Sequence, residues 1–171
     1  FFQTIFPGGF FGVDVFFTFS GFLITALLVE EFSKNHEIDL IGFFRRRFYR
    51  IVPPVVLMVL VTMPFTFLVR QDYVAGIGGQ IAGVLGFMTN FYELLTGGSY
   101  ESQFIPHLFV HNWSLAVEVH YYILWGLAVW FLSKQAKSNG QLKGMVFLLS
   151  AAAFLISFFS MFIGSFLVTS Y

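Results

Sequence analysis

One apolar run of the sequence, residues 113–132, contains a carboxylate and several hydroxyl-bearing side chains. Ser114, Glu118 and Tyr121 follow each other at spacings of four and three residues, and Tyr122 lies next to this row. Such spacing places side chains along one face of a helix. A carboxylate beside hydroxyl groups can transfer protons or orient a sugar hydroxyl. We therefore predict Glu118, Tyr122 and Ser114 as catalytic residues. The alternative is an interfacial aromatic belt that contains one buried acid.

A second acid within a strongly apolar run is Asp14, in residues 10–29. A carboxylate at the centre of a bilayer costs at least about 2.5–3.5 kcal/mol, so such residues usually face protein or a water-filled cavity. Asp14 shares one helix face with Thr18, Gly21 and Thr25, and small polar residues of this kind suit close contact with another helix. We predict that Asp14 is a structural carboxylate, paired within a helical bundle.

Arginines are clustered immediately before the apolar run 51–69, at positions Arg45, Arg46, Arg47 and Arg50. One interpretation is that this positive charge orients the run in the membrane and has no further function. Guanidinium groups also bind phosphates through paired hydrogen bonds, so a phosphate site is the other interpretation, and both remain open. Pro53 and Pro54 open the run, and because proline suits the first turn of a helix we expect the helix to begin there.

No metal site is predicted from the histidines. His107 and His111 are four residues apart and could share a face, but the sequence offers no third ligand at a suitable spacing. His120 lies roughly opposite Glu118 on a helical wheel, so we do not expect the two to form a dyad. The chain has no cysteine, which excludes a thiol nucleophile and a disulfide framework.

The overall composition indicates a membrane protein. Of 171 residues, 57% are hydrophobic and only 11% are charged, whereas soluble domains carry about 25% charged residues. The formal net charge of zero excludes a general nucleic-acid binder, for which a basic excess is expected. Transmembrane helices need roughly 20 mostly apolar residues, and four runs qualify: 10–29, 51–69, 113–132 and 144–168. We predict an all-α, multi-pass membrane protein.

The charges of the loops predict how these runs cross the membrane. Short loops rich in Lys and Arg are usually cytoplasmic, which assigns residues 30–50 and 133–143 to the cytoplasm and the start of the chain to the outside. Residues 93–111 contain acids but no Lys or Arg, so they should face outside. These assignments place both ends of the glycine-rich segment 74–92 outside, so the segment cannot cross the membrane once. Either 74–92 re-enters the membrane without crossing it, or the lysines of 133–143 do not indicate a cytoplasmic loop. Both alternatives remain open.

Three blocks of sequence resemble the integral-membrane acyltransferase-3 family, and within it the peptidoglycan O-acetyltransferases of Gram-positive bacteria. The blocks are FPGGFFGVDVFFTFSGFLIT, FFRRRFYRIVPP and HNWSLAVEVHYYILW, and their order and spacing match over about residues 1–132. The resemblance implies a bundle of about ten transmembrane helices, of which residues 1–171 form a part. It also implies transfer of an acetyl group from cytosolic acetyl-CoA to an extracytoplasmic sugar hydroxyl, that of peptidoglycan N-acetylmuramic acid, at the bacterial plasma membrane.

The resemblance also suggests a role for each candidate residue. The family's WSLxxExxFY pattern reads WSLAVEVHYY here, so Glu118 and Tyr122 would line the site where acceptor and acyl group meet. Arginines at the cytosolic mouth would bind the phosphates of CoA, namely Arg46, Arg47 and Arg50, and Asp14 would hold a neighbouring helix in register. Members often use a catalytic His, with an Arg upstream of it, on the helix before FPGG. Both would lie before Phe1, and we expect the later helices to be missing as well.

The implied partners are a cell-wall glycan or another surface polysaccharide as acceptor and the lipid bilayer, with no nucleic acid and no metal. Some members of the family also carry an extracellular esterase-like domain. A different class of function, a proton-coupled transporter or channel subunit, also fits intramembrane acids. A non-catalytic membrane scaffold is a third alternative, and it would not need the arginine cluster.

Overall fold

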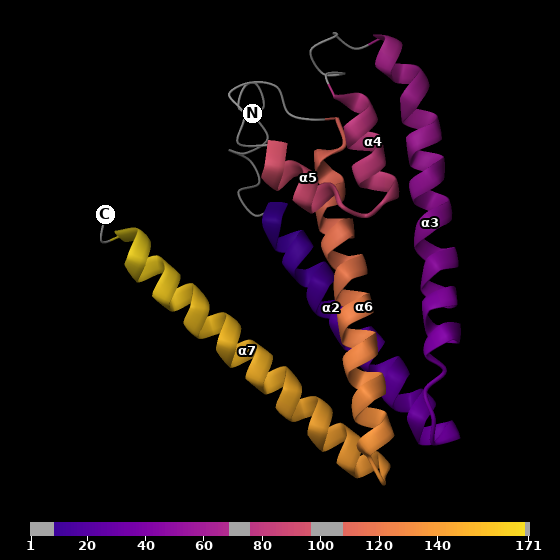
Figure 1. Ribbon diagram of the computed structural model, residues 1–171, viewed down its shortest axis with the longest axis vertical. Helices are drawn as coiled ribbons and strands as arrows, with labels where there is room; N and C mark the ends of the chain where they lie inside the picture. Colours follow the sequence, from indigo (N-terminus) through magenta and orange to yellow (C-terminus); the bar gives the residue numbers. More distant parts are fainter. Residues whose placement is uncertain (1–8, 69–75, 97–107, 170–171) are drawn as a thin grey trace. The chain divides into compact units, whose positions relative to one another are not determined.

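The computed structural model describes residues 9–68, 76–96 and 108–169. It contains six α-helices in these residues: α2 (Gly9–Asn35), α3 (Leu40–Phe65), α4 (Ile77–Leu85), α5 (Thr89–Thr96), α6 (Trp113–Gln135) and α7 (Asn139–Thr169) (Figure 1). Two short 3₁₀ segments, Thr66–Leu68 and Val110–Asn112, follow α3 and precede α6. No strand occurs among the described residues, and the helices α2, α3, α6 and α7 are long and apolar enough to cross a membrane. The predicted all-α membrane fold is confirmed.

Helix α3 begins eleven residues before the apolar run that predicted it. Asp39 is its N-cap, and the Asp39 side chain accepts a hydrogen bond from the Gly42 backbone N–H at 2.9 Å. The arginines therefore lie on the helix, and Pro53 and Pro54 lie inside it. The expectation that these prolines form the first turn is wrong. An N-cap carboxylate fixes where a helix starts, arginine is a good helix former, and helices that cross membranes tolerate internal proline.

The glycine-rich segment 74–92 contributes two short helices, α4 and α5, joined by a tight turn. Helix α4 ends in a Schellman motif, in which the Met88 N–H bonds to the Gly83 carbonyl at 2.7 Å and the Phe87 N–H bonds to the Val84 carbonyl at 3.2 Å. Phe87 occupies the left-handed position of this motif, with φ of 53°. Glycine is the usual residue there, and a side chain in this conformation costs roughly 1–2 kcal/mol.

Glycines allow α4 and α5 to pack closely. The Tyr92 ring of α5 lies against α4 so tightly that a Cβ atom added at Gly79 would be 2.9 Å from Tyr92 Cε2. The Tyr92 hydroxyl also donates to the Gly76 carbonyl at 3.4 Å. With nine and eight residues and about 1.5 Å of rise per residue, neither helix reaches across a hydrocarbon core of about 30 Å. This geometry favours the alternative in which 74–92 re-enters the membrane.

The described helices form two compact units. The first takes in the described parts of Phe1–Gly21 and Asp39–Trp125. Its buried apolar cluster joins Val55 and Val59 of α3 to Val84 of α4 and to Phe109, and Phe87 packs against this cluster. The buried Gln80 side chain accepts a hydrogen bond from the Phe109 N–H at 3.4 Å, which ties α4 to the segment that enters α6.

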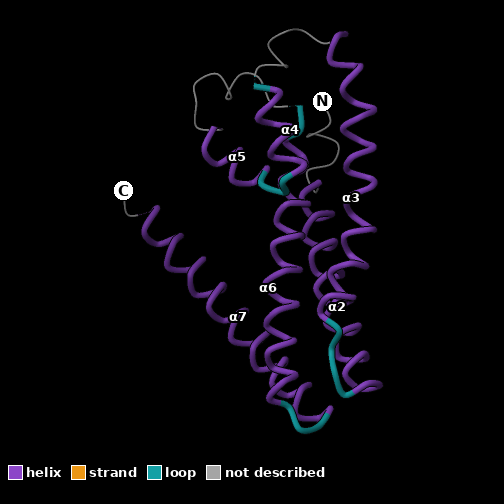
Figure 2. Tube along the Cα trace, turned by 45° about the vertical axis from the view of Figure 1, so that its right-hand side comes forward, coloured by secondary structure: helices purple, strands orange, loops and turns teal. Residues whose placement is uncertain are grey.

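The second unit takes in the described parts of Phe22–Ile38 and Gly126–Tyr171. Its core consists of buried side chains from the ends of α2 and α6 and the start of α7, among them Leu28, Val129 and Leu142. The Asn139 side-chain amide donates to Ser33 Oγ at 2.8 Å. The loop after α2 and the turn before α7, drawn in teal in Figure 2, therefore lie at the same end of this unit. Which side of the membrane these two segments face stays a prediction.

Candidate functional site

A buried carboxylate on α6 is the centre of the candidate site. Glu118 is 5% exposed, and its Oε1 atom accepts hydrogen bonds from two hydroxyl groups. One donor is Ser20 Oγ on α2, at 2.9 Å, and the other is the hydroxyl of Tyr122, one helical turn further along α6. Among the described residues, no basic side chain lies within 4.0 Å of this carboxylate, and the two hydroxyls stabilise it. Hydrogen bonding of this kind offsets the cost of burying a charge.

A cation from α3 completes the arrangement. The guanidinium of Arg47 lies 5.6 Å from the centroid of the Tyr122 ring and 5.7 Å from that of Phe43, which is within the range of a cation–π interaction. The phenol of Tyr122 thus contacts a positive group with its ring and a carboxylate with its hydroxyl. We refer to Ser20, Arg47, Glu118 and Tyr122 as the Glu118 network; its members come from α2, α3 and α6.

The structure brings together two of the three predicted catalytic residues. Glu118 and Tyr122 are hydrogen-bonded to each other, whereas the Ser114 hydroxyl donates to the backbone carbonyl of His111 at 3.3 Å. The serine that reaches Glu118 is Ser20, which lies 98 positions away in the sequence and which the sequence analysis missed. The available signal was a hydroxyl inside the apolar run FTFSGFL, directly before Gly21.

Of the helix face that was predicted to pack through Asp14, the part near Gly21 approaches another helix, whereas Asp14 itself does not. Gly21 lies close to α6, where a Cβ atom at that position would be 3.1 Å from the Tyr121 hydroxyl. Asp14 is exposed, and its backbone carbonyl accepts a hydrogen bond from the Thr18 hydroxyl at 2.8 Å. No described residue contributes a hydrogen bond or an ion pair to the Asp14 carboxylate. A structural role for Asp14 stays a prediction.

The arginines predicted to bind phosphate do not share one environment. Arg47 is half-buried and turned toward Tyr122, while Arg46 and Arg50 are exposed one helical turn apart. Both side chains are exposed to solvent or lipid, and their binding of phosphates stays a prediction. His120 packs edge-on against Phe91 of α5, with ring centroids 5.6 Å apart. His107 lies outside the described residues.

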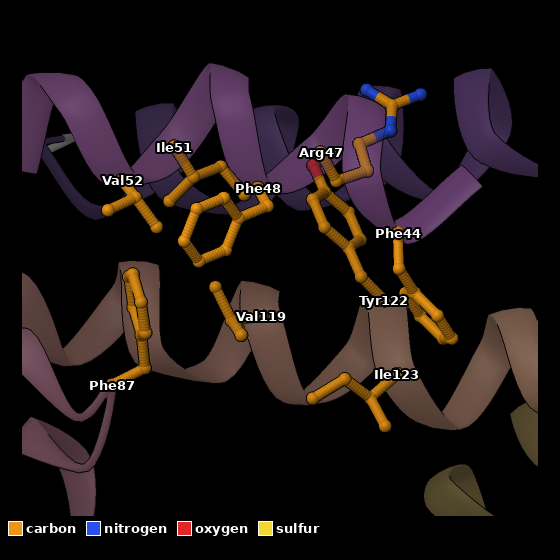
Figure 3. Close-up of a pocket in the computed structure, with 9 residues that line it drawn as sticks. All are labelled: Phe44, Arg47, Phe48, Ile51, Val52, Phe87, Val119, Tyr122 and Ile123. Carbon is orange, nitrogen blue, oxygen red and sulfur yellow. The ribbon is translucent and has the colours of Figure 1, made fainter. Parts of the chain in front are cut away.

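A cavity of about 330 Å³ lies between α3 and α6, next to the Glu118 network. Its wall is almost entirely hydrocarbon, and Arg47 and Tyr122 are its polar members (Figure 3). The apolar lining consists of Phe44, Phe48, Ile51 and Val52 of α3, Val119 and Ile123 of α6, and Phe87 of the α4–α5 turn. Mostly apolar cavities of this size with a few polar groups are typical of small-molecule sites.

Comparison with known proteins gives a consistent result. Residues 1–171 match the acyltransferase-3 family, which is described as an acyltransferase domain. Over 130 residues the chain is 34% identical to O-acetyltransferase OatA of Staphylococcus aureus (strain NCTC 8325 / PS 47), covering 76% of this chain and 22% of that protein.

Over 119 residues it is 33% identical to peptidoglycan O-acetyltransferase OatA of Listeria monocytogenes, covering 69% of this chain and 19% of that protein. The chain thus spans about a fifth of the length of these curated relatives. No solved structure matches it.

Proposed function

Because the chain belongs to the acyltransferase-3 family, as its three sequence blocks predicted, we propose that it is part of a membrane O-acetyltransferase. The donor is acetyl-CoA on the cytosolic side, and the acceptor is a sugar hydroxyl of peptidoglycan on the outer side, that of N-acetylmuramic acid. The observation that carries the proposal is the Glu118 network: a buried carboxylate with hydroxyl partners on a membrane-spanning helix, beside an apolar cavity. The names of the two relatives, an O-acetyltransferase and a peptidoglycan O-acetyltransferase, support acetyl as the transferred group and peptidoglycan as the acceptor.

In the proposed reaction an ester bond replaces a thioester bond, and one proton moves from the sugar hydroxyl to sulfur. The oxygen of the sugar hydroxyl forms a bond to the acetyl carbonyl carbon, and the carbon–sulfur bond of the thioester breaks. The hydroxyl loses its proton to Glu118, and the proton ends on the CoA sulfur, so that the products are an acetyl ester and free CoA. Glu118 acts as the general base, and Ser20 and Tyr122 hold its carboxylate through Oε1.

The positive groups have two separate tasks in this proposal. Arg47, whose guanidinium lies 5.6 Å from the centroid of the Tyr122 ring, holds this ring beside the cavity through a cation–π contact. Arg46 and Arg50 are exposed and can bind the phosphates of CoA. Asp14 keeps its proposed role in holding a neighbouring helix.

The test is acetyl transfer by the full-length protein in membrane vesicles. Vesicles are given labelled acetyl-CoA on one side and a peptidoglycan oligosaccharide on the other, and O-acetyl ester on the glycan is measured. We expect Glu118→Gln, which keeps the shape of the side chain but not its basicity, to lower the rate by about 10²–10⁴-fold at an unchanged protein level. Near-normal transfer by this variant would refute the role of Glu118. Proton movement without ester formation by the unmodified protein would instead favour a proton-coupled transporter.

A further inference from the structure

The cavity between α3 and α6 is larger than an acetyl group requires. Its volume is about 330 Å³, whereas a protein cavity of about 150 Å³ already accommodates benzene. An acetyl group has half as many heavy atoms as benzene. The space therefore suits either a longer acyl chain or an acetyl group together with the adjoining thioethyl part of its donor.

The two ends of the cavity are lined by different residues. Arg47 and Tyr122, which belong to the Glu118 network, lie toward one end, and the Phe87 ring lies toward the other (Figure 3). Between them the wall is formed by apolar side chains such as Phe48 and Val119. An acyl group whose carbonyl reacts beside Tyr122 would extend its hydrocarbon tail toward Phe87.

Phe87 is held in place at a conformational cost. It has φ of 53° at the position of the α4–α5 turn where glycine is favoured, and its side chain packs against the apolar cluster formed by α3, α4 and Phe109. Strained residues of this kind persist where the surrounding structure determines them, and they concentrate at ligand sites. A glycine here would relieve the backbone but would leave the end of the cavity open.

We propose that the cavity binds the acyl group of the donor, and that the Phe87 ring closes its far end and so sets the longest acyl chain that is transferred. The proposal rests on the proposed acyltransferase function, since it concerns the acyl specificity of that same site. Discrimination per methylene in an apolar pocket is typically about 10- to 200-fold, so removal of one ring from the wall should change the ranking of donors measurably.

The experiment compares acyl-CoA donors of increasing length, from acetyl to octanoyl, with the full-length protein in membrane vesicles. We expect the unmodified protein to transfer acetyl and short-chain acyl groups. Phe87→Ala and Phe87→Gly should each raise the rate with hexanoyl-CoA relative to acetyl-CoA by about tenfold or more. Val119→Phe, which fills the middle of the cavity, should restrict transfer to acetyl. Met88→Ala is the matched control, because Met88 is exposed in the same turn and lies outside the cavity wall.

The outcomes separate this inference from the function on which it rests. If acetyl transfer persists and the ranking of donors is the same in all variants, the acyl-chain role of the cavity is refuted while the acyltransferase function stands. If the unmodified protein transfers no acyl group from any CoA thioester, both are overturned. Because Val119→Phe acts from α6, it tests the cavity independently of any effect that the Phe87 variants have on the folding of the turn.

Discussion

Replacement of Ser20 by alanine tests whether the Glu118 network operates as a unit. The substitution removes the hydroxyl that donates to Glu118 Oε1 at 2.9 Å and leaves Tyr122 as the donor to the same oxygen. A hydrogen bond to a charged group contributes about 1.5–3 kcal/mol, which corresponds to about 10- to 150-fold in an equilibrium or a rate. Because Tyr122 still holds the oxygen, we expect a loss near the lower limit, about tenfold in kcat.

The assay is acetyl transfer to a glycan by the full-length protein in membrane vesicles, with kcat and the KM for acetyl-CoA determined separately. Ser20→Thr retains a hydroxyl and should restore most of the activity that Ser20→Ala loses. Ser150→Ala is the matched control, because Ser150 lies on α7 and its hydroxyl donates to the Val146 carbonyl at 2.8 Å, away from the Glu118 network. Ser114→Ala compares the serine chosen from sequence with the serine that the structure places beside Glu118.

A double-mutant cycle decides whether Ser20 acts through Glu118. In a Glu118→Gln background, Ser20→Ala should cause little further loss, because the group that it positions has already been neutralised. If Ser20→Ala lowers the rate tenfold in both backgrounds, Ser20 acts by another route and the network is not a functional unit. If Ser20→Ala alone has full activity, the hydrogen bond has no catalytic importance.

Three further predictions follow from the helices around the site. Arg47→Lys keeps the charge but loses the flat stacking surface, so kcat should fall by about 2- to 30-fold, as expected for 0.5–2 kcal/mol of cation–π energy; a rise in the KM for acetyl-CoA alone would indicate direct phosphate binding instead. Gly79→Leu meets a tyrosine ring of α5 and should destabilise the fold by about 1–3 kcal/mol, seen as a lower thermal midpoint in detergent, whereas Gly78→Leu, with open space around it, should not. Cysteines placed at Lys34 and Lys137 should both resist a membrane-impermeant thiol reagent added outside intact cells, and labelling of either would refute the cytoplasmic placement of the basic loops.

The membrane-spanning helices could be predicted from local sequence because their cause is local. A helix that crosses lipid must satisfy its own backbone hydrogen bonds and needs about 20 apolar residues, so runs of hydrophobic residues revealed α2, α3, α6 and α7 directly. The proximity of Glu118 to Tyr122 could be predicted for a similar reason, because side chains four residues apart on one helix lie one turn apart and can interact. The start of α3 was predicted eleven residues too late, because its first turns (residues 40–50) include four arginines and lie outside the apolar run.

Which sides of these helices meet was decided only by the tertiary structure. A helix that is apolar all round has no polar face to show which side is buried. The sequences of α2 and α6 therefore could not predict that Ser20, rather than Asp14 or Ser114, bonds to Glu118. The contact of Arg47 with Tyr122 likewise depends on how α3 packs against α6. Phe87 lines the cavity together with side chains of α3 and α6, so its position depends on packing between segments distant in sequence.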